Sequence, residues 1–304
     1  MSAPLSEGVR TTLLSVAVNV VLAVAKFSVG LLANSAALVA DGIHSLVDLV
    51  SDIAALVGLR FADLPKDEDH PYGHHRINTV ATLVISCLVL AFCLGLGWHS
   101  VRSLVEGAAT EVPGVAAAWV AGVALVVKEG FYRHARRQAE RLGSRLLLAN
   151  ATDHRADAVA SLLALVAVIA AQLDPALAAL DQVVGLALAG WLGAEGLRLL
   201  KGAVDDLLDT SPAETVLKDL SEHILAVPGV RGFHAFRARR LGDRLEVDFH
   251  LQVDPAASVG EGHALAGKVK ADILATHPEV VSVLVHVEPD EAHHRGAQGH
   301  SGRS

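Results

Sequence analysis

Carboxylate and histidine side chains recur at helical spacing inside apolar segments of the chain. Asp41, His44 and Asp48 lie at positions i, i+3 and i+7 of one segment, which places them on one face of a helix. Asp52 extends this face by one turn. Asp41 and Asp52 are each expected to be either a ligand or a group that supports the ligands. A carboxylate at bilayer depth costs about 2.5–3.5 kcal/mol unless it meets a polar interior or a cation. The face is therefore predicted to share a cationic partner.

A later apolar segment repeats the four-residue spacing with Asp153 and Asp157. Two helices that each present such a pair can surround one cation. In the alternative interpretation these acids lie at a helix end and pair with water or with arginines such as Arg155. We favour the cation site because ionisable residues inside membrane segments generally serve function.

The loop LPKDEDHPYGHHRIN offers a second set of ligands. Asp67, His70 and His74 supply a carboxylate and two imidazoles within eight residues, with Asp69 and His75 as spare candidates. This spacing is compact enough for a zinc-like cation. A solvated polar loop remains an equal alternative on spacing alone.

The last third of the chain contains a third set of histidines. His234, His250 and His286 come from three predicted strands, Glu288 shares the face of His286, and His263 lies early in a predicted helix. Three imidazoles on one sheet face beside a carboxylate favour a metal cluster over isolated surface histidines. The tail adds three histidines that fit a solvated segment better than a site: His293, His294 and His300.

The elements that position these residues are predicted to be six membrane helices followed by a small domain. The 304 residues are 52% apolar and only 19% charged, with a mean hydropathy of +0.43. Six spans of about 20 residues each leave enough chain for one small domain. We place the spans at residues 10–32, 36–62, 77–101, 113–133, 146–173 and 178–201.

Lysine and arginine are concentrated in alternate loops, so both termini are expected in the cytoplasm. The basic residues lie around the second loop and in residues 133–145, whereas the other connections lack them. We expect a short cytoplasmic N-terminus (1–9), a transmembrane domain (10–209), a cytoplasmic metal-binding regulatory domain (210–290) and a disordered tail (291–304).

The residues after Asp209 predict an αββαβ domain. A capping box of Ser211 and Glu214 is expected to open a helix at 212–226. Two strands follow around a Gly-Asp turn, then a helix at 258–276 and a strand at 280–288. The fold class is thus an α-helical membrane protein with a C-terminal α+β domain of ferredoxin-like or metallochaperone-like order.

Composition also argues against one class of partner. The net charge of −8 without a basic block, and an aromatic content of 4%, argue against nucleic acid. The two cysteines, Cys87 and Cys93, lie in an apolar run and are expected to serve packing.

At about residues 10–290 the chain resembles the cation diffusion facilitator family of divalent-metal/proton exchangers. The likeness rests on ADGIHSLVDLVSD (40–52), DHPYGHHRIN (69–78), NATDHRAD (150–157), LLDTSPAE (207–214) and the αββαβ tail. The resemblance implies a transport site at four residues: His44, Asp48, Asp153 and Asp157. It implies a loop site at three: Asp67, His70 and His74. It also implies a binuclear cytoplasmic site: His234, His250, His286 and Glu288, with His263 bridging. Arg76 and Asp209 are expected to form a salt bridge at the centre of a dimer.

One position departs from the family pattern. Zinc members commonly carry histidine where this chain has Asp153, and the neighbouring His154 points about 100° away on a helix. One imidazole with three carboxylates favours harder cations such as Mn²⁺ or Fe²⁺ over zinc alone.

The resemblance implies a homodimeric antiporter rather than an enzyme. It is expected to export Zn²⁺, Fe²⁺ or Mn²⁺, with Co²⁺ and Cd²⁺ as further substrates, against protons through a lipid bilayer, here a bacterial inner membrane. The alternative is a membrane-anchored metal sensor or assembly scaffold that binds metal without moving it. A passive cation channel is a third reading, and it predicts flux without proton dependence.

Overall fold

The computed structural model describes residues 3–62, 64, 67–106, 111–142, 145–242 and 244–290. Side chains are described for these residues except 3–16, 51–52, 54–62, 139, 142, 145–147 and 149–150. The side chain of Asp52 and the tail histidines His293, His294 and His300 therefore lie outside the described part. The chain divides into two compact units: residues 1–56 with 82–200, and residues 57–81 with 201–304.

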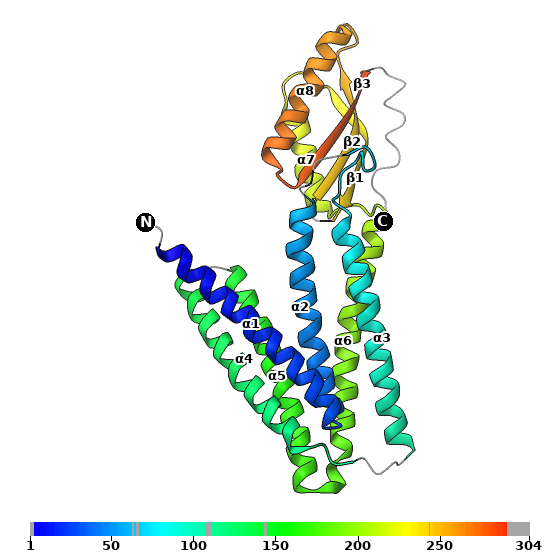
Figure 1. Ribbon diagram of the computed structural model, residues 1–304. Helices are drawn as coiled ribbons and strands as arrows, with labels where there is room; N and C mark the ends of the chain where they lie inside the picture. The colour runs from blue at the N-terminus through cyan, green and yellow to red at the C-terminus, as the bar shows by residue number, and fades with distance from the viewer. Residues whose placement is uncertain are drawn as a thin grey trace. The chain divides into compact units, whose positions relative to one another are not determined.

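Six long helices form the first two thirds of the chain (Figure 1). They are α1 (Ala3–Leu32), α2 (Ala36–Ala62), α3 (Ile77–Val105), α4 (Val115–Leu142), α5 (Arg145–Leu173) and α6 (Ala179–Leu207), with the short 3₁₀ helix Pro175–Leu177 before α6. Among the described residues, four stretches are long and apolar enough to cross a membrane: Ile77–Val105, Val115–Gln138, Ala151–Leu173 and Pro175–Leu207. The six predicted spans are compatible with this finding.

Small residues let the helices of the first unit approach closely. A Cβ atom on Gly42 of α2 would lie 2.6 Å from the backbone nitrogen of Phe27 in α1. A Cβ on Gly185 of α6 would lie 2.8 Å from Ala36 at the start of α2. Close packing through small residues is typical of helices in membranes. It fixes α2, which carries His44 and Asp48, between two neighbours.

Helix α4 continues past the predicted end of its span at residue 133 and ends at Leu142. Figure 1 shows it running beside α5. The extension is charged, and its ion pairs have helical spacing: Arg133 with Glu129 at 2.7 Å and Arg136 with Glu140 at 2.8 Å. Pairs at i, i+4 support a helix beyond its apolar part, so the helix is longer than the predicted membrane span.

The second unit contains an α+β domain whose predicted αββαβ order is confirmed. Its elements are α7 (Glu214–Ala226), β1 (Gly232–Leu241), β2 (Arg244–Val253), α8 (Val259–Thr276) and β3 (Val280–Pro289). The sheet order is β1-β2-β3, with β1 antiparallel and β3 parallel to β2. Helices α7 and α8 cover one sheet face through buried side chains such as Leu220, Phe249 and Ile273.

One local prediction for this domain is wrong, and one strand is irregular. The N-cap of α7 is Ala213, with an extended ψ of 145° and no side-chain cap bond, so Ser211 lies too early to form the predicted capping box. The strand β3 is irregular at its start, because Leu245 pairs with Val280 but Glu246 pairs with Ser282. The extra residue is a bulge, and it buries Val280 and Val283, three positions apart.

Candidate metal sites

Three of the four residues predicted for the transport site come together in the helical unit. Nε2 of His44 lies 3.4 Å from Oδ1 of Asp157 and 3.9 Å from Oδ2 of Asp48. One ligand atom from each of the three lies within 4.8 Å of the others. The Asp157 side chain is 7% exposed and that of Asp48 is 49% exposed. The group is thus anchored in the helix packing at α5 and open on the Asp48 side.

Asp153 lies one turn before Asp157 on α5 and is exposed. It is not part of the group formed by the described residues His44, Asp48 and Asp157. His154 contacts the ring of Phe131 in α4, with ring centroids 5.6 Å apart. Arg155 lies with its guanidinium 4.7 Å from the centre of the Tyr132 ring. The cationic side chain that pairs with Asp157 therefore belongs to a residue other than Arg155.

That residue is Lys128 of α4, which the sequence analysis did not single out. Its Nζ donates to Oδ2 of Asp157 over 2.6 Å, and the two side chains are 5% and 7% exposed. Each oxygen of Asp157 thus has its own partner, His44 or Lys128. A lysine inside an apolar segment was the available signal, because buried ammonium groups are paired as a rule.

Asp41 belongs to a separate buried network. Its Oδ1 accepts from Nζ of Lys26 over 2.9 Å, and its Oδ2 accepts from the hydroxyl of Ser161 over 2.8 Å. Lys26 also donates to Ser45 over 3.2 Å. The side chains of Lys26 and Asp41 are fully buried. Asp41 therefore joins α1, α2 and α5 and does not face the His44 group.

A carboxylate of α6 holds the start of α2. Asp181 accepts from the Ser35 hydroxyl and from the backbone N–H of Ala36, each over 2.6 Å. These N–H groups at a helix start have no partner within the helix. Asp181 therefore caps α2 from a distant segment, which sequence reasoning did not find.

The predicted loop residues also come together. Oδ1 of Asp67 lies 3.1 Å from Nδ1 of His70, and its Oδ2 lies 3.2 Å from Nε2 of His74. The backbone N–H of His70 donates to Asp67 over 2.6 Å, and this bond lowers the pKa of the Asp67 carboxyl. Asp69 and His75 are not in this group of described residues. The carboxylate is ionised and lies between two imidazoles, which suits a zinc-like ion.

Strand register aligns the three histidines of the C-terminal domain. His234 of β1 pairs with His250 of β2, and His250 pairs with His286 of β3. Glu288 lies among them, with Oε2 2.8 Å from Nε2 of His234 and Oε1 2.7 Å from Nδ1 of His250. His286 lies 3.4 Å from the same carboxylate. Among the described residues, one ligand atom from each of His234, His250 and Glu288 lies within 4.8 Å of the others, whereas His286 and the exposed His263 of α8 are outside this group.

Glu288 is held in its charged form. Burial alone raises the pKa of its carboxyl, but hydrogen bonds from His234 and His250 outweigh burial, so the pKa is lowered. An ionised carboxylate only accepts hydrogen bonds and can bind a cation without first losing a proton. The cluster is thus chemically ready for a divalent metal.

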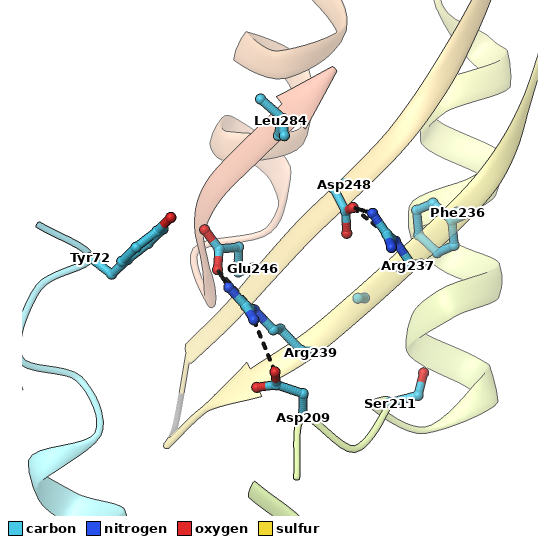
Figure 2. A pocket seen from close by; sticks show the side chains of 10 residues that line it. Tyr72, Asp209, Ser211, Phe236, Arg237, Arg239, Glu246, Asp248 and Leu284 are labelled. Carbon is cyan, nitrogen blue, oxygen red and sulfur yellow. Dashed lines mark hydrogen bonds and ion pairs between the residues drawn. The ribbon is translucent and has the colours of Figure 1, made fainter. Parts of the chain in front are cut away.

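Arg76 and Asp209 form an ion pair within the second unit. Asp209 also accepts from Nη1 of Arg239 over 3.0 Å, and Arg239 binds Glu246 over 2.7 Å. Figure 2 shows the Arg239 guanidinium between these two carboxylates, with the Arg237–Asp248 pair beside them on the same strands. Burial raises the pKa of Asp209, but the bonds from Arg76 and Arg239 outweigh it, so the pKa is lowered.

Both parts of the chain match families of known proteins. The cation efflux transmembrane domain matches residues 12–208, and the cytoplasmic domain of cation efflux proteins matches residues 212–290. The chain belongs to the cation diffusion facilitator family. This is a family of transporters, not of enzymes, and the predicted resemblance is confirmed. Together with the apolar helices, it makes the chain a multi-pass membrane protein.

Three curated relatives of this cation diffusion facilitator are similar over nearly the whole chain. Metal tolerance protein C1 of Arabidopsis thaliana is 36% identical over 94% of this chain and 63% of its own length. The chain thus spans less than two thirds of that relative. The uncharacterized transporter YdbO of Bacillus subtilis is 35% identical, and the manganese efflux system protein MneS of the same species is 33% identical. Each of these two alignments covers 94% of this chain and 97% of the relative.

A solved nickel form of the MamM CTD covers 26% of this chain and 100% of its own, at 30% identity and a TM-score of 0.26.

Proposed function

We propose that this protein exports a divalent metal cation from the cytoplasm in exchange for protons. The observation that carries the proposal is the group of His44, Asp48 and Asp157, which places an imidazole and two carboxylates from α2 and α5 within 4.8 Å of one another. Ionisable groups inside membrane helices usually mark the path of an ion. Membership in a family of metal transporters supports the same conclusion.

The residues present suit exchange of metal for protons. Metal binds neutral imidazole and ionised carboxylate, so protons compete with metal for the same atoms. A nitrogen of His44 that the cation leaves is therefore available to accept a proton. Lys128 occupies one oxygen of Asp157, and an arriving cation replaces its ammonium group.

Manganese and iron are the substrates that we favour. The group is richer in oxygen than in nitrogen ligands, and oxygen ligands suit harder cations. A relative named as a manganese efflux system supports this choice. Asp153, one turn from Asp157, is proposed as the fourth ligand, reached when the helices rearrange around a bound ion.

The cytoplasmic sites are proposed to regulate transport in a homodimer. The cytoplasmic-domain match supports dimerisation, and Arg76 with Asp209 is proposed to lie at the dimer centre. The occupancy of the loop site and of the strand cluster then follows the metal level in the cytoplasm, with His263 supplying the bridging ligand. The strand cluster consists of His234, His250, His286 and Glu288. Both termini are proposed to face the cytoplasm, and a bacterial inner membrane is the proposed location.

The test is simultaneous measurement of Mn²⁺ uptake and proton release in proteoliposomes that contain the purified protein. We expect Mn²⁺ flux that accelerates when the lumen is acidic and that moves protons outward. Metal binding without flux would identify a sensor or scaffold instead. Flux that ignores the proton gradient would identify a channel.

A further inference from the structure

A fourth group of metal-ligating side chains lies on the helical side of the C-terminal domain. It consists of Asp219 and His223 of α7 and of His277, which follows α8; one ligand atom from each lies within 4.8 Å of the others. We propose that these residues bind one transition-metal cation such as Zn²⁺, Co²⁺ or Ni²⁺. Binding there does not depend on transport.

Local structure explains why these residues meet. Asp219 and His223 are four residues apart on α7 and share one helical face. His277 ends α8, where its backbone N–H donates to the carbonyl of Ile273 over 2.9 Å. The neighbouring Leu220 and Ile273 are fully buried in the same core. The ligands are thus held on rigid elements that pack against one another.

The two imidazoles already have the separation that a metal requires. Nε2 of His277 lies 3.2 Å from Nδ1 of His223. Two nitrogens bound at about 2.0–2.1 Å to a tetrahedral ion are about 3.3–3.4 Å apart. Nδ1 of His223 also lies 2.9 Å from the carbonyl oxygen of Asp219. A cation between the rings would replace these two hydrogen bonds, with a small turn of the His223 ring.

A second carboxylate orients His277. Nδ1 of this ring lies 3.3 Å from Oε1 of Glu279, whose backbone directly precedes β3. A proton on Nδ1 that is donated to Glu279 leaves Nε2 free as a ligand. Metal-binding histidines usually donate their other nitrogen to a carboxylate in this way. Glu279 is therefore a positioning residue for the site.

Charge and access favour a cation at this place. Oδ1 of Asp219 lies 3.7 Å from Nδ1 of His223, and Oδ2 lies 3.9 Å from Nδ1 of His277. The side chain of His277 is 5% exposed, that of His223 34% and that of Asp219 59%. The ligands thus range from a buried anchor to an open carboxylate, beside a groove that Asp219 and Glu279 help to line. An ion can enter from solvent on the Asp219 side.

The site also makes a mechanical connection. A cation held by these ligands ties the middle of α7 to the turn between α8 and β3. A ligand that binds only the folded state stabilises it by an amount that grows with the logarithm of the ligand concentration above Kd. Metal at this site is therefore expected to raise the melting temperature of the domain.

The experiment uses the full-length protein in detergent, stripped with a chelator, in a His250→Ala/His286→Ala background that weakens the strand cluster. Co²⁺ is titrated and followed by equilibrium dialysis and by its visible absorption. His223→Ala is expected to bind one Co²⁺ fewer per chain. Glu279→Gln is expected to keep the ion with about 10–100-fold weaker affinity. Lys218→Ala, on the same helix but outside the ligand set, is the matched control and keeps full binding.

His277→Ala is a second variant, although removal of the buried His277 ring can unfold the domain. His223→Ala decides the proposal in that event, since it leaves the buried ring in place. Equal Co²⁺ stoichiometry and affinity in His223→Ala and in its parent would overturn the proposal. The transport-deficient Asp157→Ala chain is expected to bind Co²⁺ here unchanged, so failure of transport and failure of this site are told apart.

Discussion

Lys128 of α4 donates to Asp157 of α5 over 2.6 Å, and both side chains are almost fully buried. An ammonium group therefore competes with any cation for one oxygen of the carboxylate that also faces His44. Hydrogen bonds between charged groups contribute about 1.5–3 kcal/mol. In the proposed transport site, this competition is expected to determine how tightly metal is held and how readily it is released.

Replacing Lys128 with methionine is expected to tighten metal binding. The substitution removes the competing ammonium group while filling the same space, so Mn²⁺ affinity should rise about tenfold or more, since 1.4 kcal/mol is tenfold. Mn²⁺ titration of the detergent-solubilised protein measures this. Lys128→Arg preserves the positive charge and serves as the control. Unchanged or weaker Mn²⁺ binding in Lys128→Met would contradict the competition.

The Lys26–Asp41 pair is expected to contribute to stability and not to metal specificity. Lys26→Ala leaves a fully buried carboxylate without its ion-pair partner, a loss that commonly costs about 3–5 kcal/mol. The double variant Lys26→Met/Asp41→Leu removes both charges and should recover most of that loss. Denaturant unfolding in detergent compares them. Equal destabilisation by the single and double variants would show that the unpaired carboxylate of Asp41 is not the cause of the lost stability.

Asp209 makes the stability of the second unit depend on pH. Its pKa is lowered in the folded state because the bonds from Arg76 and Arg239 outweigh burial. The stabilisation is fully present above the unfolded-state pKa of about 3.9 and is lost as the pH falls through the folded-state value. The difference in melting temperature between wild type and Asp209→Asn should therefore shrink below about pH 4. A difference that does not change as the pH falls would contradict this cause of the pH dependence.

Asp153→His is expected to shift selectivity from Mn²⁺ and Fe²⁺ toward Zn²⁺. The change exchanges an oxygen ligand for an imidazole, which suits zinc. Competition transport assays with Mn²⁺, Fe²⁺, Zn²⁺, Co²⁺ and Cd²⁺ measure the shift. Identical metal selectivity in the variant and the wild type would contradict a role of Asp153 as a ligand and would agree with its exposed position in the structure.

The C-terminal fold was predictable because its signals are local. Alternation along β2 and the turn before Arg244 define two antiparallel strands, and the register then brings His234 and His250 together. The loop group was equally accessible, since its three members lie within eight residues. In both regions the sequence pattern predicted most of the side chains that lie close together in the structure.

Interactions between distant helices were not predictable in the same way. Lys128 and Asp157 are 29 residues apart, and His223 and His277 are 54 apart. Helical periodicity gives the face of each residue but not which helix lies opposite. The role of Asp41 was not predictable for the same reason. Its spacing from His44 suggests a shared helical face, but its partners are Lys26 and Ser161. The packing of whole elements against one another decides these partners, and it depends on the complete unit.

The central claim is that metal crosses the membrane through His44, Asp48 and Asp157, and its most direct test is Mn²⁺ uptake by proteoliposomes under a pH gradient. Asp157→Ala and Asp48→Asn are expected to abolish uptake while the protein stays folded. Asp48→Asn is the cleaner variant, because it leaves Lys128 with its buried partner. Asp174→Asn, an exposed acid before α6, should transport at the wild-type rate. Wild-type uptake by folded Asp48→Asn and Asp157→Ala proteins would contradict the site.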